Sequence, residues 1–466
     1  MRSRDLAKLG IPSGDLRTQT LKIVGRAMKR GESAADVRER VEAMATTPTS
    51  YVDDAEFGPL ARELVRLEEA RKRFEKRAEP APWRQWGEDL EPQAVDQMRN
   101  ACDLPVAVRG ALMPDAHLGY GLPIGGVLAT ENAVIPYAVG VDIACRVKMT
   151  VLDLPPSLLE EGEDRLVRAI ETETRFGIGA KFKNPRQHDV LDADWGVSPV
   201  TKKEKDRGRA QLGTSGSGNH FVEFGLLVVD DDSGLELDRG TYLALLSHSG
   251  SRGTGAAVAS HYSKLAMQEH PELPAALRHL AWLDLDSEAG QEYWQAMNLM
   301  GEYAEANHAC IHRHIAAHLG AEVLLDLENH HNFAWEEEHD GRKLIVHRKG
   351  ATPAGEGVIG LIPGSMASAT YVVRGKGEAS SLDSAAHGAG RVMSRTRAKS
   401  TFSWDEVKPY LAARNVKLLS SGLDEVPMVY KDIEQVMAAQ ADLVEPLAKF
   451  QPRLVKMAPA GERPED

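Results

Sequence analysis

The chain has 466 residues, 42% hydrophobic and 27% charged, a balance typical of a folded protein with room for two to three domains. No apolar run reaches the roughly 18 residues of a membrane span, and the start of the chain lacks the apolar stretch of a signal peptide. We therefore expect a cytoplasmic protein without a membrane partner. The formal net charge of −13 argues against a protein that coats nucleic acid regardless of sequence.

The first part of the chain is predicted to be helical. Residues 18–30 and 33–44 carry apolar side chains at helical spacing, and residues 60–78 have the dense Arg, Lys and Glu content of a solvated amphipathic helix. Two prolines and two tryptophans between residues 80 and 86 mark a boundary. We predict an N-terminal helical region over residues 1–87, with no residues that suggest chemistry.

The composition changes from about residue 88. Glycine becomes frequent, and short apolar runs alternate with loops, which predicts an α+β fold. We expect one large mixed α/β body over residues 88–458. Residues 459–466 are predicted to form a disordered tail.

One loop places a carboxylate and a thiol three residues apart. Asp142 and Cys145 follow residues 133–139, which read as an extended segment. Three cysteines in the whole chain exclude a disulfide framework, so Cys145 is a structural thiol, a nucleophile or a metal ligand. On its own the structural interpretation is favoured, because free cysteines are among the most buried residues.

Several histidine loops add to this pattern. The candidate ligands lie at predicted strand ends or in loops rich in glycine and serine: Asp142, Cys145, His220, His248 and one of His330 and His331. Imidazoles with one thiolate and one carboxylate suit Mn, Fe, Co or Zn. Five candidates that share a single thiolate suggest two metal ions bridged by Cys145, with open positions for substrate.

Other segments leave alternatives open. The glycine-rich residues 213–218 are able to cradle phosphate, but they match neither a Walker loop nor the Rossmann fingerprint. Asp115 and His117, in a loop of glycines and prolines, either support a site or only form a turn. The histidines of the predicted helix 290–320 are expected to form a partly exposed face. The basic cluster at 202–209 is interpreted as a solvated face, and the one at 391–399 as a phosphate site.

Taken together, these ordered motifs resemble the RtcB-type RNA ligases, which join RNA 3′-phosphate and 5′-hydroxyl ends in tRNA splicing. The resemblance covers about residues 88–457. The matching runs are 113–126, 140–145, 216–221, 248–253, 331–332, 347–351, 362–366 and 387–395, with weaker similarity around Tyr430 and Lys456. It implies an RtcB-like body with a dimetal cleft.

The resemblance also implies roles for single residues. In that family the residue matching His387 attacks the α-phosphorus of GTP and becomes guanylylated, the guanylate passes to an RNA 3′-phosphate, and a 5′-hydroxyl expels GMP. Two Mn²⁺ ions are implied at Asp142, Cys145, His220, His248 and His331. The implied nucleotide contacts are Asn219, Glu223, His331, Ser365, His387, Gly388, Gly390, Arg391, Tyr430 and Lys456. Arg252, Lys349 and Arg395 are implied to hold substrate phosphates.

The chain also departs from the family pattern at Ala144, Arg146 and Ser215, which fits a divergent subgroup devoted to RNA repair. Arg146 either contacts RNA phosphate or only fills space. Three functions compete: the GTP- and Mn-dependent ligase, a dimetal phosphoesterase that acts on RNA ends without GTP, and a non-catalytic sensor of RNA damage. The implied partners are RNA with broken 3′-phosphate or 2′,3′-cyclic phosphate ends and 5′-hydroxyl ends, and an archease-like activating protein.

Overall fold

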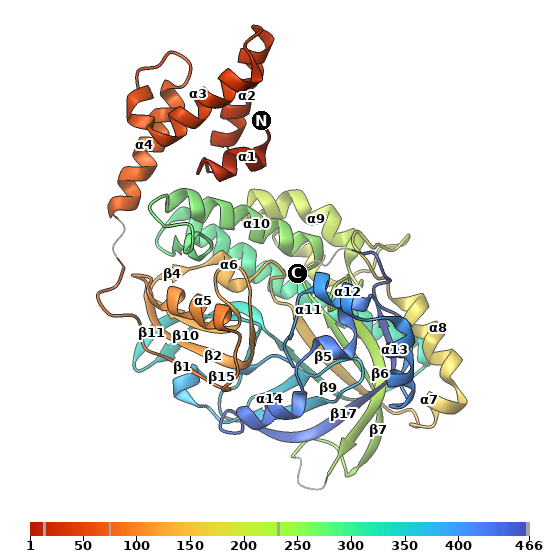
Figure 1. Ribbon diagram of the computed structural model, residues 1–466. Helices are drawn as coiled ribbons and strands as arrows, with labels where there is room; N and C mark the ends of the chain where they lie inside the picture. Colours follow the sequence, from red (N-terminus) through yellow and green to blue (C-terminus); the bar gives the residue numbers. More distant parts are fainter. Residues whose placement is uncertain (13–14, 74–75, 231–233, 463–466) are drawn as a thin grey trace. The chain divides into compact units, whose positions relative to one another are not determined.

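The computed structural model describes residues 1–12, 15–73, 76–230 and 234–462 (Figure 1). The chain divides into two compact units: residues 1–75 with 270–275, and residues 76–269 with 276–466. Within the described residues, no helix is both long and apolar enough to cross a membrane. Of the predicted tail, residues 463–466 lie outside the described part of the chain.

The smaller unit is helical and has an apolar core of its own. Its helices are α1 (Ser3–Lys8), α2 (Asp15–Lys29), α3 (Ala34–Thr46), the 3-10 helix η1 (Pro48–Tyr51) and α4 (Gly58–Arg73). The apolar positions of these helices pack into one cluster, in which Val41, Met44 and Leu60 are all at most 1% exposed. Amphipathic helices bury their apolar faces in this way. Ser33 caps α3 by accepting a hydrogen bond from the Asp36 amide at 3.2 Å.

The larger unit is built on an eight-stranded sheet. Its strands follow the order β13 (Ile359–Pro363), β14 (Thr370–Gly375), β17 (Val444–Met457), β6 (Phe221–Val229), β7 (Gly240–Ser249), β5 (Arg146–Leu152) and β9 (Val323–His330), and β16 (Lys417–Ser420) also pairs with β17. Neighbours along the path are antiparallel, and only β16 runs parallel to its partner. The mixed architecture confirms the predicted α+β class.

A second sheet of five strands carries the loop of residues 118–123 between β2 and β3. Its order is β1 (Trp83–Gln85), β2 (Ala107–His117), β3 (Ile124–Thr130), β11 (Arg342–Lys349) and β10 (Asn332–His339). Two short pairs complete the strands: β12 (Ala351–Pro353) with β15 (Ser384–Ala386), and β4 (Ala133–Val134) with β8 (Leu283–Asp284).

Helices cover these sheets (Figure 1). They are α5 (Pro92–Cys102), α6 (Pro136–Val139), α7 (Leu158–Glu161), α8 (Glu163–Glu173), α9 (Pro199–Gln211), α10 (Arg252–Glu269), α11 (Glu288–Leu319), α12 (Arg395–Thr401), α13 (Trp404–Ala412) and α14 (Ile433–Ala439). Short 3-10 helices lie between them: η2 (Asp189–Asp192), η3 (Trp195–Val197), η4 (Arg278–Leu280), η5 (Ala379–Ser381), η6 (Leu423–Glu425) and η7 (Pro427–Val429).

The long helix α11 packs against β5 and β7, and this packing corrects one expectation. His308, Cys310 and His312 are buried, so the predicted exposed histidine face is wrong for them. His308 and His312 both bond the Ser247 hydroxyl at 2.8 Å. The histidines therefore satisfy buried polar groups between helix and sheet.

The pairing register of the large sheet places the ends of four strands, β5, β6, β7 and β9, next to one another. Arg146 at the start of β5 pairs with Ser249 on β7 and with His330 on β9. Phe221 at the start of β6 pairs with His248 on β7. Because these ends are neighbours, residues just before or after them converge on one place.

Candidate metal and nucleotide site

The converging strand ends border a cavity of about 510 Å³ in the larger unit. Both sheets contribute to its wall, together with the loops after β2, β13 and β15. Of the residues predicted from the sequence, the wall includes Asp142, Cys145, Asn219, His220, Glu223, His248, His331, Lys349, Ser365, His387, Gly388, Gly390, Arg391, Arg395 and Tyr430.

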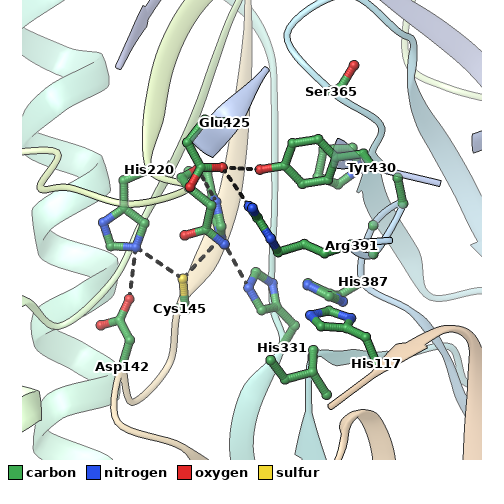
Figure 2. A pocket seen from close by; sticks show the side chains of 18 of the residues that line it. His117, Asp142, Cys145, His220, His331, Ser365, His387, Arg391, Glu425 and Tyr430 are labelled. Carbon is green, nitrogen blue, oxygen red and sulfur yellow. Dashed lines mark hydrogen bonds and ion pairs between the residues drawn. The ribbon is translucent and has the colours of Figure 1, made fainter. Parts of the chain in front are cut away.

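Two groups of metal-binding side chains share the Cys145 thiol. One group is Asp142, Cys145 and His220, the other is Cys145, His248 and His331, and within each group the ligand atoms lie within 4.8 Å of one another. The Cys145 sulfur is 3.5 Å from His220 Nε2 and 3.1 Å from His248 Nε2. All five side chains are buried. Figure 2 shows Cys145 between Asp142 and His331.

Backbone groups aim these ligands into the cavity. His220 Nδ1 lies 2.8 Å from the Ser215 carbonyl oxygen, and His248 Nδ1 lies 3.1 Å from that of Asn219. When each carbonyl oxygen accepts a hydrogen bond from Nδ1–H, Nε2 keeps a lone pair that faces the thiol. Gly250 leaves room for the carboxylate, because a Cβ there would lie 2.2 Å from Asp142 Oδ2.

The donor set fits a pair of divalent cations. Burial, reinforced by nearby imidazoles, lowers the pKa of His248 to about 3 and that of His331 far below its ordinary value, so both rings are neutral ligands at neutral pH. Burial alone would raise the pKa of Asp142, but its interactions with His220 and Arg252 outweigh burial and lower that pKa below its ordinary value, so this carboxyl is ionised. One thiolate, one carboxylate and three imidazoles suit Mn, Fe, Co or Zn.

His387 lies beside this centre and is held by a buried acid. Its Nδ1 is 2.7 Å from Asp115 Oδ2, and the Asp115 side chain is 0% exposed. The ring centroid lies 4.8 Å from that of His331, and Figure 2 shows His117 alongside. Gly390, at φ +72°, is required because a Cβ there would come within 2.0 Å of the Asp115 carbonyl oxygen. The acid therefore fixes the ring with Nδ1–H donating and Nε2 unprotonated.

Another wall of the cavity is organised by a carboxylate that sequence analysis missed. Glu425 accepts hydrogen bonds from Arg391, at 3.2 Å, and from the Tyr430 hydroxyl (Figure 2). It also forms an ion pair with Arg395. Glu425 is 3% exposed. Its neighbour Asp424 pairs with Lys399 at 3.2 Å. Glu425 stands in a short 3-10 helix, and no spacing pattern there distinguishes it from an ordinary surface acid.

Two residues that the family resemblance assigns to substrate or nucleotide contacts, Arg252 and Lys456, do not line the cavity. Arg252 is 2% exposed, does not line the cavity, and lies 3.3 Å from His220 Nδ1. Lys456 points away from the wall formed by Val455 and Met457, and its Nζ lies 3.1 Å from Glu171.

Lys349 lines the cavity, yet its Nζ donates to two backbone carbonyl oxygens, Tyr120 at 2.5 Å and Tyr137 at 2.9 Å. Burial lowers the pKa of Lys349 to about 7. The same side chain therefore ties two loops together and keeps a nitrogen at the cavity wall.

In two pairs of residues that are adjacent in the sequence, only one member belongs to the candidate metal site. His331 belongs to the ligand group, whereas His330 packs against Phe333 and Trp335. Arg146 does not line the cavity, because it points to the side opposite Cys145 and pairs with Glu328 on β9.

The fold and the cavity define an α+β protein with a candidate two-metal centre beside an oriented histidine. Comparison with known sequences then assigns the family: the family described as tRNA-splicing ligase RtcB matches residues 97–457, and the chain belongs to that family. It is 36% identical over 406 residues to the RNA-splicing ligase RtcB of Escherichia coli (strain K12), covering 79% of this chain and 95% of the relative.

Two further relatives are also matched over most of their length. The chain is 34% identical to the tRNA-splicing ligase RtcB of Nanoarchaeum equitans, over 78% of this chain and 91% of the relative. It is 30% identical to that of Thermococcus kodakarensis, over 84% and 98%. The residues matched by the family begin after the helical unit of residues 1–75.

Proposed function

We propose that the protein is a GTP- and Mn-dependent RNA ligase that joins 3′-phosphate or 2′,3′-cyclic phosphate ends to 5′-hydroxyl ends. The observation that carries the proposal is the 2.7 Å contact between Asp115 and His387, beside two ligand groups that share Cys145. A phosphoesterase needs the metal groups alone. An oriented histidine that is not part of either group supports a covalent step.

In the first step, His387 Nε2 attacks the α-phosphorus of GTP, the bond to the bridging oxygen breaks, and pyrophosphate leaves. Nδ1 keeps its proton throughout and donates a hydrogen bond to Asp115, whose negative charge stabilises the imidazolium that forms. Arg391 and Arg395, held at the wall by Glu425, offer positive charge to the phosphates.

In the second step, an oxygen of the RNA 3′-phosphate attacks the guanylate phosphorus and restores neutral His387. The product is an RNA end joined through two phosphates to guanosine. In the third step, the 5′-hydroxyl attacks the RNA phosphorus and GMP leaves, which completes a 3′,5′-phosphodiester. A 2′,3′-cyclic phosphate must first be opened by water to a 3′-phosphate.

Asp142, Cys145, His220, His248 and His331 would hold two Mn²⁺ ions. Bound ions supply positive charge that neutralises phosphate oxygens as bonds to phosphorus form and break. We assign the nucleotide contacts to Asn219, Glu223, Ser365, Gly388, Gly390 and Tyr430, which line the cavity, and not to Lys456, whose side chain pairs with Glu171. Burial raises the pKa of Glu223 well above its ordinary value, so this neutral carboxyl is able to donate a hydrogen bond to a nucleotide acceptor.

The test is covalent labelling. Protein incubated with Mn²⁺ and GTP labelled at the α-phosphorus should retain one guanylate on His387, visible by intact mass, and His387→Ala should retain none. Equal labelling of the two proteins would contradict the proposal. Conversion of RNA ends by unlabelled protein without any nucleotide would instead support the phosphoesterase.

We further propose that the RNA substrates are broken ends produced in tRNA processing or by damage, that an archease-like protein acts as activator, and that the protein works in the cytoplasm. The activator is testable directly, because it should increase the number of turnovers per guanylylated protein without changing the site of labelling.

A further inference from the structure

An aromatic side chain stands in solvent at the edge of the cavity. Tyr120, in the loop between β2 and β3, is 68% exposed, the highest value among exposed large hydrophobic side chains of the described residues. Its neighbour Leu118 is 47% exposed, and both residues line the cavity. Apolar surface left open beside polar catalytic groups marks a place where a ligand binds.

The loop beneath this ring is fixed by hydrogen bonds on both sides. The Leu118 amide donates to Glu91 at 2.9 Å, and Gln97 bonds both the amide and the carbonyl of Gly119, at 3.0 and 2.6 Å. The Tyr120 carbonyl oxygen accepts from Lys349 at 2.5 Å. The exposed ring therefore projects from an ordered backbone, and a ligand that contacts it need not first order the loop.

Other aromatic rings support Tyr120 from one side. The His279 ring meets it edge-on with centroids 5.8 Å apart, and Tyr137 meets His279 at 4.8 Å. Gly121 permits this approach, since a Cβ there would lie 2.6 Å from the His279 carbonyl oxygen. With 68% of the residue exposed, the ring keeps surface open to solvent.

The exposed ring belongs to the His387 side of the cavity. Lys349 bonds the Tyr120 carbonyl oxygen, and Gly350, the next residue, faces His387, whose Cε1 would be 3.1 Å from a Cβ at that position. A nucleotide whose phosphate is near His387 would therefore have its base close to Tyr120.

We propose that Tyr120 is a stacking platform for the terminal nucleobase of an RNA end, with His279 and Tyr137 holding the platform in place. This inference rests on the proposed function, because it assigns one contact of the RNA that the ligase would join. Stacking suits an enzyme that accepts many RNA ends, because every base has a π-face and the contact is tolerant of sequence.

The test uses RNA that carries 2-aminopurine, a base whose fluorescence is quenched when it stacks on an aromatic ring. One RNA carries it at a 3′-phosphorylated terminal nucleotide, and a second carries it at a 5′-hydroxyl terminal nucleotide. Wild-type protein should quench one of the two, which identifies the end that stacks. Tyr120→Ala should reduce the quenching and raise the RNA concentration for half-saturation by roughly five-fold or more, whereas Tyr120→Phe should retain both.

The matched control is Tyr410→Ala, which removes a tyrosine from α13 outside the cavity. Circular dichroism checks that each variant is folded. Quenching by Tyr120→Ala equal to that of wild type, or no quenching of either RNA by wild type, would overturn the platform. Failure of wild-type protein to accept guanylate on His387 in the absence of RNA would overturn the ligase proposal instead, so the two failures are distinguishable.

Discussion

Asp115 and His387 are 272 residues apart in the chain, yet Oδ2 of the acid lies 2.7 Å from Nδ1 of the histidine. The acid comes from the end of β2 in the smaller sheet, and the histidine follows β15. Two glycines make the approach possible, since a Cβ at Gly390 or Gly125 would come within 3.0 Å of Asp115 atoms. The contact sets which ring nitrogen is free to react.

Asp115→Asn should slow guanylylation of His387 by roughly three to four orders of magnitude. The amide nitrogen donates rather than accepts, so it favours the ring tautomer in which Nε2 carries the proton and is unable to attack. In Ser-His-Asp catalytic triads the same replacement of the acid costs about 10⁴-fold in rate. The measurement is the rate of label transfer from α-labelled GTP. Asp340→Asn is the control, because that acid is exposed in the turn between β10 and β11 and forms an ion pair with Arg109. A labelling rate for Asp115→Asn within a few-fold of wild type would show that the contact is not needed.

Cys145→Ala should disturb both metal positions, whereas Asp142→Ala should disturb one. Cys145 belongs to both ligand groups, and Asp142 belongs to a single group. Mass spectrometry of metals in protein equilibrated with Mn²⁺ and then desalted should give two ions for wild type, one for Asp142→Ala, and fewer than one for Cys145→Ala.

Cys310→Ala serves as the matched control for this loss. Cys310 is also a buried free thiol, but it lies on α11 outside both groups. It should retain two ions. Equal metal content in the Cys145 and Cys310 variants would contradict the shared-thiolate centre.

How far the sequence predicts this site depends on the kind of residue. Metal ligands belong to few residue types, so Cys145 and His220 stand out at the ends of predicted strands, and the strand register then brings them together. Residue types alone leave His330 and His331 open, and the family resemblance selects His331; one-residue alternation explains why only that ring joins the ligand group. The helical spacing of the first 46 residues likewise predicts α2 and α3, because local apolar periodicity is enough to define an amphipathic helix.

Residues whose role depends on distant partners were not predictable. No local pattern marks Glu425 as the acceptor for Arg391 and Tyr430. The sequence around Asp115 is equally consistent with a turn residue, and only the contact with His387 shows its role in the site. The histidines of α11 gave a wrong expectation for the same reason, since their burial follows from packing against β5 and β7. Tertiary contacts carry no periodic signal in a single sequence.

Wild-type protein should lose stability as the pH rises above about 4.5, and Glu223→Gln should not show this loss. Burial raises the folded-state pKa of Glu223 well above its ordinary 4.5, so above that pH the folded protein retains a proton that the unfolded chain has released. Stability then falls with increasing pH, by at most about 1.4 kcal/mol per pH unit. Urea midpoints of wild type and variant, compared without nucleotide from pH 5 to 8, measure the difference.

The control for this series is Glu445→Gln on the adjacent strand β17. Glu445 is an exposed acid paired with Arg374, so its replacement should leave the pH profile parallel to that of wild type. A profile for Glu223→Gln that is also parallel to wild type would mean that the buried carboxyl is ionised like the others.

Lys349 should give the opposite pH dependence. Burial lowers its folded-state pKa from 10.5 to about 7, so between these values the unfolded chain binds a proton that the folded protein lacks. Its contribution to stability therefore increases from pH 7 upward and is lost as pH falls through 7. The difference in urea midpoint between wild type and Lys349→Met should grow in favour of wild type from pH 7 to 9, whereas Lys343→Met, an exposed lysine on the same strand β11, should give a constant difference. A constant difference for Lys349→Met as well would show that this nitrogen stays protonated in the folded protein, held by its hydrogen bonds to two backbone carbonyl oxygens.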